Sequence, residues 1–194
     1  SVIMISDTYV IKEYNAGTIS DRSGSISGNS DPRPFTGTTL SSVTYINRED
    51  RVPVFRLSTS TNFADLTNWP TDYRCQSLRS YNDFLIALNT TEGTSTFPNR
   101  VRWSNLALSN AVPDSWDETD LTKSAGFNDL GEMQTGIVDG IPLGSNFIIY
   151  SSDQVYLMEF VGGTFIFNFR KLFTDAGLIN QNCAVEIDGK HYCF

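Results

Sequence analysis

The stretch that decides the fold runs from Val155 to Arg170 and reads VYLMEFVGGTFIFNFR. Its first part, Val155–Phe160, alternates as a strand with one buried face does, and its last part, Phe165–Arg170, places three phenylalanines on one side of a second strand. Between them, Gly162-Gly163 is a strong signal for a two-residue β-hairpin turn. The stretch therefore predicts an antiparallel hairpin whose aromatic side chains pack against a neighbouring sheet.

Strand signals of this kind extend along the whole chain, whereas helical periodicity is nearly absent. The best helical candidate, Asn62–Trp69, is short and runs directly into Pro70. Runs of β-branched and aromatic residues, bounded by Gly, Asn, Asp and Ser, predict strands over residues 2–5, 8–14, 43–46, 52–57, 75–78, 84–89, 100–103, 137–143, 147–151, 155–161, 165–173 and 184–194. The chain is therefore predicted to be all-β.

A hairpin pattern also recurs, because residues 78–88, 141–150 and 185–194 each read as strand, polar turn and apolar strand. If Phe84, Phe147 and His191 are equivalent, they lie 63 and 44 residues apart. The second spacing is typical of a four-stranded propeller blade, and the first allows a blade with an inserted loop over residues 91–126. We therefore predict β-propeller-type blades of antiparallel strands. A β-sandwich built from the same hairpins is the alternative.

Two parts are expected along the chain. Residues 1–70 form a β-rich N-terminal part with a long Ser/Gly-rich loop, 18–38, which either reaches a neighbouring protein or is a surface loop without a role. Residues 71–194 form the blade segment. Since both ends of the chain lie in strand-type runs, we expect a portion of a longer protein, or an edge that another chain completes.

Composition narrows the class of protein. The chain has 194 residues, 40% of them hydrophobic, and its 22 acids and 14 bases give a net charge of -8. This predicts a folded domain and disfavours a dedicated nucleic-acid binder. The acidic charge is interpreted as ordinary solubility, and the alternative is a wall that DNA slides past without sticking. Cys75, Cys183 and Cys193 do not suit a disulfide framework or a zinc site, and are expected to be buried, reduced thiols. No apolar run reaches the roughly 20 residues of a membrane span.

Few residues suggest chemistry. His191 is the only histidine, no common catalytic motif occurs, and we expect neither catalysis nor a cofactor or metal. The acidic run 114–120 lacks the glycine and final glutamate of an EF-hand, and is interpreted as a solvated loop. In the alternative, paired carboxylates of this run act on a sugar that stacks on Trp103 and Trp116. Anchoring of the loop by these tryptophans is the favoured interpretation.

The order of several motifs resembles a family of virion structural proteins from tailed, mostly short-tailed, bacteriophages: the tail nozzle and hub proteins built on a β-propeller. The resemblance covers roughly residues 70–194 and depends on the order of Asn99–Ser104, Pro113–Trp116, Gly136–Gly140, Phe160–Gly163 and Phe167–Leu172. It implies no catalytic residues. Arg102, Trp103, Trp116, Gly162 and Gly163 would be positions that support the fold.

The function implied by this resemblance is structural. The protein would form a ring, usually a hexamer, around the DNA exit channel of the virion tail, after assembly in the host cytoplasm. Its partners would be copies of itself, other tail proteins such as the adaptor and a fibre or needle, and DNA that passes without sequence-specific binding. The alternative is a carbohydrate-binding or glycan-cleaving propeller that acts in receptor recognition. A β-sandwich interaction module is a third hypothesis.

Overall fold

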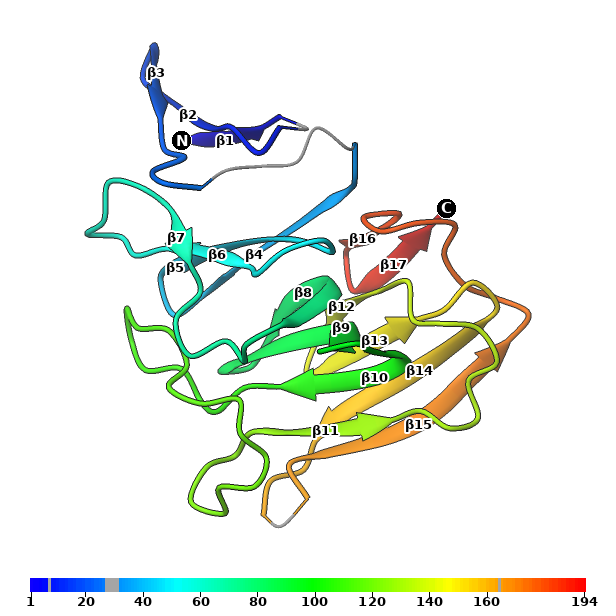
Figure 1. Ribbon diagram of the computed structural model, residues 1–194. Coiled ribbons are helices and arrows are strands. Elements are labelled where there is room, and N and C mark those ends of the chain that lie inside the picture. Colours follow the sequence, from blue (N-terminus) through cyan, green and yellow to red (C-terminus); the bar gives the residue numbers. More distant parts are fainter. Residues whose placement is uncertain (7, 27–31, 164) are drawn as a thin grey trace.

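The computed structural model describes residues 1–6, 8–26, 32–163 and 165–194, and these residues form an all-β protein (Figure 1). The strands are β1 (Val2–Ile5), β2 (Ile11–Asn15), β3 (Thr18–Asp21), β4 (Phe35–Leu40), β5 (Val43–Arg48), β6 (Val54–Arg56), β7 (Ala64–Asp65), β8 (Tyr73–Tyr81), β9 (Phe84–Glu92), β10 (Ser95–Trp103), β11 (Gly126–Asp129), β12 (Asp139–Leu143), β13 (Asn146–Tyr150), β14 (Gln154–Phe160), β15 (Phe167–Thr174), β16 (Ala184–Ile187) and β17 (Lys190–Cys193). The described residues contain no helix, and hence none long and apolar enough to cross a membrane.

The strands form five antiparallel sheets in chain order. β1–β3 make a three-stranded first sheet, and β4–β7, β8–β11 and β12–β15 make the second, third and fourth sheets, with four strands each. β16 and β17 form a two-stranded fifth sheet. Every strand pairs with its neighbours in sequence, so each sheet is a meander.

The middle sheets are buried on both faces, which explains their continuous apolar runs. In β9, Leu85 and Ala87 pack toward the second sheet, whereas Phe84, Ile86 and Leu88 pack toward the fourth. The same alternation repeats along the chain, and four hydrophobic clusters separate the five sheets. Stacking of this kind differs from a sandwich, in which two sheets enclose one core.

From the second sheet onward, the first strands of successive sheets adjoin one another. β8 contacts β4 on one side and β12 on the other, and β12 contacts β16. The four-stranded meanders therefore lie side by side with their first strands in contact, as the blades of a propeller do. The described residues do not close into a ring (Figure 1). The prediction of an all-β fold with antiparallel sheets is confirmed.

Two predicted loops are shorter than expected. Within the stretch 18–38, β3 takes the first four residues and β4 begins at Phe35, while residues 27–31 lie outside the described residues. The inserted loop is 104–125 instead of 91–126, because β9 extends to Glu92 and β10 occupies residues 95–103. The strand predicted over residues 100–103 is only the last part of β10, because Pro98 argues against a strand in its first part. The ladder accommodates this proline by a register shift between Phe97 and Val101.

The local turn signals were partly misread. The helical candidate Asn62–Trp69 contains the short strand β7. Gly162 and Gly163 have positive φ as expected, but the connection is longer than two residues: β14 ends at Phe160 and β15 begins at Phe167. The backbone N–H groups of Val161 and Gly162 both donate to the carbonyl of Ile166, so the bend closes there. Phe165 therefore lies outside the strand in which it was placed.

The recurring hairpins are the first hairpins of their sheets. Two-residue turns at Asn82-Asp83, Gly144-Ser145 and Asp188-Gly189 join β8 to β9, β12 to β13 and β16 to β17. Aligned on these turns, the residues equivalent to Phe84 are Asn146 and Lys190, each one position before the residue we expected. A fourth hairpin, β4–β5, escaped notice because its turn is Ser41-Ser42, and serine rarely adopts the positive φ that both residues have.

Candidate functional site

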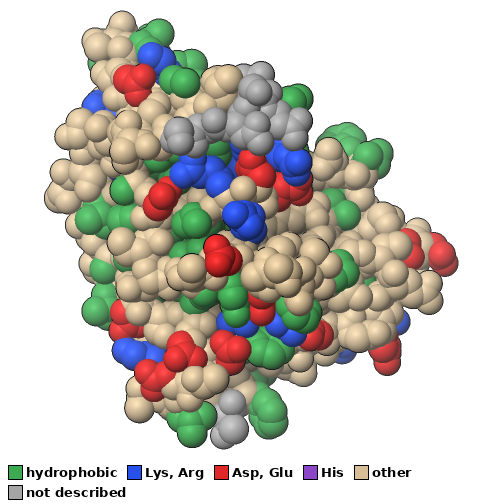
Figure 2. Space-filling model, viewed as in Figure 1, with side chains coloured by type: hydrophobic (Ala, Val, Ile, Leu, Met, Phe, Trp, Pro, Cys, Tyr) green, Lys and Arg blue, Asp and Glu red, His purple; other side chains and the backbone are tan. Residues whose placement is uncertain are grey.

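The acidic run 114–120 lies in the loop 104–125, which joins β10 to β11. Its carboxylates serve mainly to fix the loop itself. Asp117 accepts hydrogen bonds from the backbone N–H and the hydroxyl of Thr119 (2.9 and 2.7 Å), and Asp120 accepts the same pair from Thr122 (3.0 and 2.6 Å). Acidic and basic side chains gather over this loop, at the lower left of the molecule (Figure 2).

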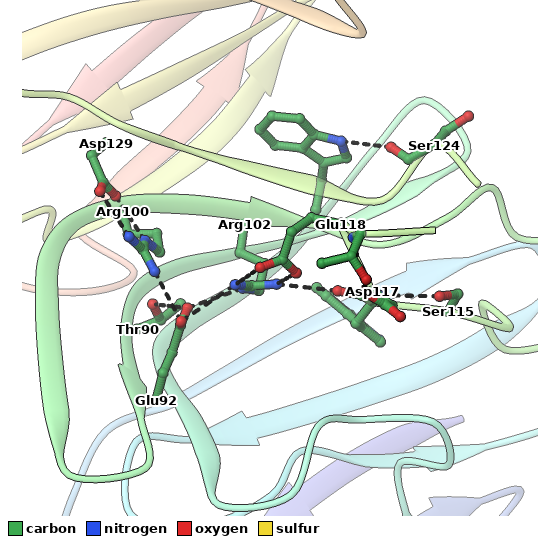
Figure 3. Close-up of polar contacts among 12 residues, drawn as sticks. Thr90, Glu92, Arg100, Arg102, Ser115, Asp117, Glu118, Ser124 and Asp129 are labelled. Carbon is green, nitrogen blue, oxygen red and sulfur yellow. Dashed lines mark hydrogen bonds and ion pairs between the residues drawn. The ribbon is translucent and has the colours of Figure 1, made fainter. Parts of the chain in front are cut away.

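A buried arginine ties the loop to the third sheet. Arg102, whose side chain is 1% exposed, donates from Nε to Glu92 (3.0 Å) and from Nη1 to Glu118 (2.8 Å) and to the carbonyl of Trp116 (3.1 Å). Glu92 also accepts a bond from Arg100 (2.8 Å), which pairs with Asp129 of β11 (2.7 Å). Figure 3 shows Arg102 held between the two glutamates. The network therefore spans β9, β10, β11 and the loop.

These contacts keep the loop carboxyl groups ionised. The hydrogen bond from Arg102 lowers the pKa of Glu118, and the salt bridge to Lys123 lowers the pKa of Asp114. Hydrogen bonds from Thr119 and Thr122 lower the pKa values of Asp117 and Asp120. A general acid for glycoside hydrolysis needs a raised pKa. The pKa values of all four carboxyl groups of the loop are lowered instead.

The two tryptophans of interest are packed against the loop and the sheets. Trp116 is 2% exposed and meets Trp69 edge-on, with ring centroids 4.7 Å apart. Trp103 is also buried, packs edge-on against Phe167 and donates from Nε1 to the carbonyl of Ser124 (2.7 Å). Both indoles thus anchor loop 104–125 from opposite sides.

The residues of the carbohydrate hypothesis are divided between two hollows. Trp116, Asp114 and Asp117 line one cavity of about 410 Å³, together with Arg102 and residues of the preceding loop. Trp103 and Asp120 line a different cleft of about 630 Å³. The structure therefore does not bring the two tryptophans into one sugar-binding surface. Among the described residues, no group of three His, Cys, Asp or Glu side chains could hold a metal ion.

Among the described residues, the most completely buried carboxylate lies elsewhere, at the adjoining first strands. Asp139 of β12 accepts two hydrogen bonds from Arg79 of β8 (2.9 and 2.5 Å) and one from the Ser77 hydroxyl (2.6 Å). The backbone N–H groups of Gly140 and Asn182 also donate to it (2.8 and 2.9 Å). Burial alone would raise the pKa of Asp139, but these donors hold it below its ordinary value.

This cluster, which we call the axial cluster (Ser77, Arg79, Asp139 and Asn182), links the second, third and fourth sheets, which we call the blade array, to the segment that leads into β16. Arg79 also donates to the carbonyl of Gly37 in β4 (3.2 Å), and the Asn182 side chain donates to that of Phe35 (2.8 Å). β4 and β12 are thus close enough for one asparagine to bond to both. Sequence reasoning quoted Asp139 within a motif but gave it no role, because its partners lie 43–62 residues away.

His191 and the cysteines have structural surroundings. The His191 ring lies between the hydroxyl of Tyr150 (2.6 Å) and the carbonyl of Pro142 (2.8 Å), and so holds the fifth sheet against the fourth. All three cysteines are free thiols. Cys75 is buried, which raises its pKa, but Cys193 is exposed. The expectation of buried thiols is wrong for Cys193, because β17 is the outer strand of a two-stranded sheet.

No protein-family model matches the chain, and no curated protein matches it significantly in sequence. The resemblance to tail nozzle and hub proteins therefore depends on the order of its motifs alone.

Proposed function

We propose that the chain is a structural, non-catalytic segment of a virion tail protein, of the nozzle or hub type. The observation that carries the proposal is the stack of meanders whose first strands are joined by the axial cluster. Such an array is stiff, because each middle sheet is packed on both faces and the buried Arg79–Asp139 ion pair joins β8 to β12 at their common side. Stiffness of this kind suits a component that holds its shape while DNA moves past.

The buried charges favour a structural role over catalysis. Arg102, Arg100 and Asp139 each have two or more bonded partners, so these groups are used to hold strands and a loop. Catalytic carboxyl groups instead tend to have raised pKa values in an open cleft. The carboxyl groups of the loop and of the axial cluster have lowered ones.

The axial cluster also bears on where DNA would pass. Asn182 bonds to both β4 and β12, so the described residues leave no room for a duplex between the first strands. In the ring that we propose, the channel lies between copies of the chain. The net charge of -8 suits a channel wall that repels the phosphate backbone.

The test is to locate the chain in an assembled particle. The expected result is that mass analysis of purified virions finds the protein that contains this sequence, and that low-resolution imaging shows it as a six-fold ring at the tail. Virions without it, or a chain that remains monomeric when the full protein is expressed, would overturn the proposal.

A glycan array separates the carbohydrate hypothesis from this one. We expect no glycan to be retained by the chain. Tight binding of one glycan that is abolished by Asp117→Ala, and retained in the Asp188→Ala control at a distant turn, would replace the structural proposal with the receptor-binding one.

A further inference from the structure

The outer side of the molecule, away from the axial cluster, carries a groove with exposed apolar rims. A cleft of about 630 Å³ lies between the outer strands β11 and β15 and the loops that follow β10 and β14, and a hollow of about 550 Å³ continues it along the start of β15. Both are lined by Asn128, Phe165, Phe167 and Phe169. We call this continuous groove the aromatic cleft.

The rims of the aromatic cleft expose large apolar side chains. Leu121 on one loop is 95% exposed, and Phe165 and Val161 on the other are 78% and 55% exposed. Figure 2 shows hydrophobic side chains at the foot of the molecule, where the β14–β15 loop of Figure 1 lies. Exposed apolar groups gathered around a hollow mark surfaces for association. The packing of the chain itself does not explain why both loops expose a large apolar side chain.

The polar side chains of the cleft indicate whether a partner segment would be charged or uncharged. In the described part of the chain, the side-chain amides of Asn128 and Asn168 have no hydrogen-bond partner, and both line the groove. Two of the three charged groups that line it are paired, Glu118 with Arg102 and Lys123 with Asp114, and the third, Asp120, accepts two hydrogen bonds from Thr122. Free amides beside apolar walls suit an uncharged peptide, whose backbone offers both donors and acceptors.

The edge of the fourth sheet provides the remaining contacts. β15 is its last strand and is eight residues long, so alternate N–H and C=O groups along its outer side point away from β14. An extended segment can add to such an edge by backbone hydrogen bonds, while pockets receive its alternate side chains. The aromatic cleft lies along this edge at Phe167–Phe169.

We propose that the edge of β15 takes up an extended, uncharged segment of a partner protein as a fifth strand, with an apolar side chain anchored in the aromatic cleft between Phe165 and Trp103. A sugar fits the site less well, because hydroxyl groups would lie against Leu121 and Phe165 at the rim. The proposal does not depend on the identity of the assembly to which the chain belongs.

The probe is acetyl-Thr-Leu-Thr-Phe-Thr-amide, titrated into the isotope-labelled chain and followed by amide NMR. The expected result is that shifts concentrate at residues 167–169 and at the side-chain amides of Asn128 and Asn168. The matched peptide with proline at its central position should bind at least tenfold more weakly, because proline lacks the N–H that a strand donates.

Two variants test the apolar anchor. Leu121→Ser and Phe165→Ser should each weaken binding of the probe at least threefold, whereas Ile179→Ser, at a residue that is 85% exposed elsewhere, should leave it unchanged. All three positions are on the surface, so the variants should fold. The proposal fails if the probe causes no shift along β15 at millimolar concentration, or if the proline peptide binds equally well. It also fails if a β-linked glucose tetramer, and not the peptide, occupies the cleft.

Discussion

Replacement of Asp139 by asparagine tests whether the axial cluster holds the blade array together. The carboxylate of Asp139 is 2% exposed, and Arg79 is 11% exposed. Removal of one partner from a buried ion pair costs about 3–5 kcal/mol, because the other charge remains without compensation. Arg79 retains bonds to Gly37 and Asn182, so we expect a loss at the lower end, about 3 kcal/mol.

A loss of this size is measurable by urea unfolding followed through tryptophan fluorescence. In a chain of this length about 3 kcal/mol lowers Tm by roughly 6–12 °C. The slope of free energy against urea should not change, since the surface exposed on unfolding is the same. The control is Asp129→Asn: its carboxylate is 48% exposed, and Arg100 retains Glu92, so the loss should be about 0–1 kcal/mol.

The dependence on pH gives an independent check. The pKa of Asp139 is lowered in the folded chain, so its stabilisation is complete above the unfolded pKa of about 3.9 and is lost as the pH falls through the folded pKa. The difference between wild type and Asp139→Asn should therefore be constant near neutral pH and shrink below about pH 4. A loss under about 1 kcal/mol at pH 7 would refute the role of the axial cluster.

Four further outcomes follow from the packing and the charges. Gly177→Ala should destabilise the chain by about 1–3 kcal/mol in urea unfolding, because the added Cβ would lie 2.2 Å from the Ser151 carbonyl oxygen. Gly131→Ala should be nearly neutral, since no atom lies within 4 Å of the Cβ that it adds. Trp116→Ala should cost about 3–5 kcal/mol, because Trp116 is 2% exposed; a neutral result in thermal melts would mean that it does not anchor the loop. A thiol reagent should modify Cys193 in the folded chain but Cys75 only after unfolding, as mass spectrometry of the labelled peptides would show. Arg56 and then Arg22 lower the pKa of Glu13 to about 2, so its stabilisation is present above about pH 4.3 and is lost toward pH 2; Glu13→Gln should remove that part of the acid sensitivity in pH-dependent melts.

The sequence predicted the strands that are buried on two faces, and it also predicted the more exposed β1, β16 and β17 from their β-branched and aromatic residues. Phe84–Asn89 and Phe147–Ser151 were found because burial on both faces demands continuous apolar runs. β3 and β11, which were missed, are short outer strands with mostly polar residues, and the first part of β10 contains Pro98, so none of these segments carries that signal. Whether a segment forms an edge strand depends on the strand with which it pairs. That partner strand lies outside the few residues from which a local sequence pattern is read.

The candidate site was least predictable where it depends on distant contacts. The run 114–120 was found because acids cluster in the sequence, but its anchoring needs Glu92 and Arg102, which come from the strands before it. The aromatic cleft had no local signal, since Leu121 and Phe165 lie on loops that only the stacking of two sheets brings together. Phe165 was instead assigned to the strand that follows it.

The two surfaces divide the molecule in a way that limits how it can assemble. On the side of the first strands, the axial cluster satisfies Asp139 with five hydrogen bonds and joins β4, β8 and β12. On the outer side, β15 ends its sheet beside exposed apolar groups. Association through the outer edges leaves the axial cluster intact, whereas association that separates β8 from β12 would break the buried Arg79–Asp139 pair at a cost of about 3–5 kcal/mol. In the ring that we propose, the copies would therefore associate through outer edges, and the central opening would lie outside the axis of every blade array.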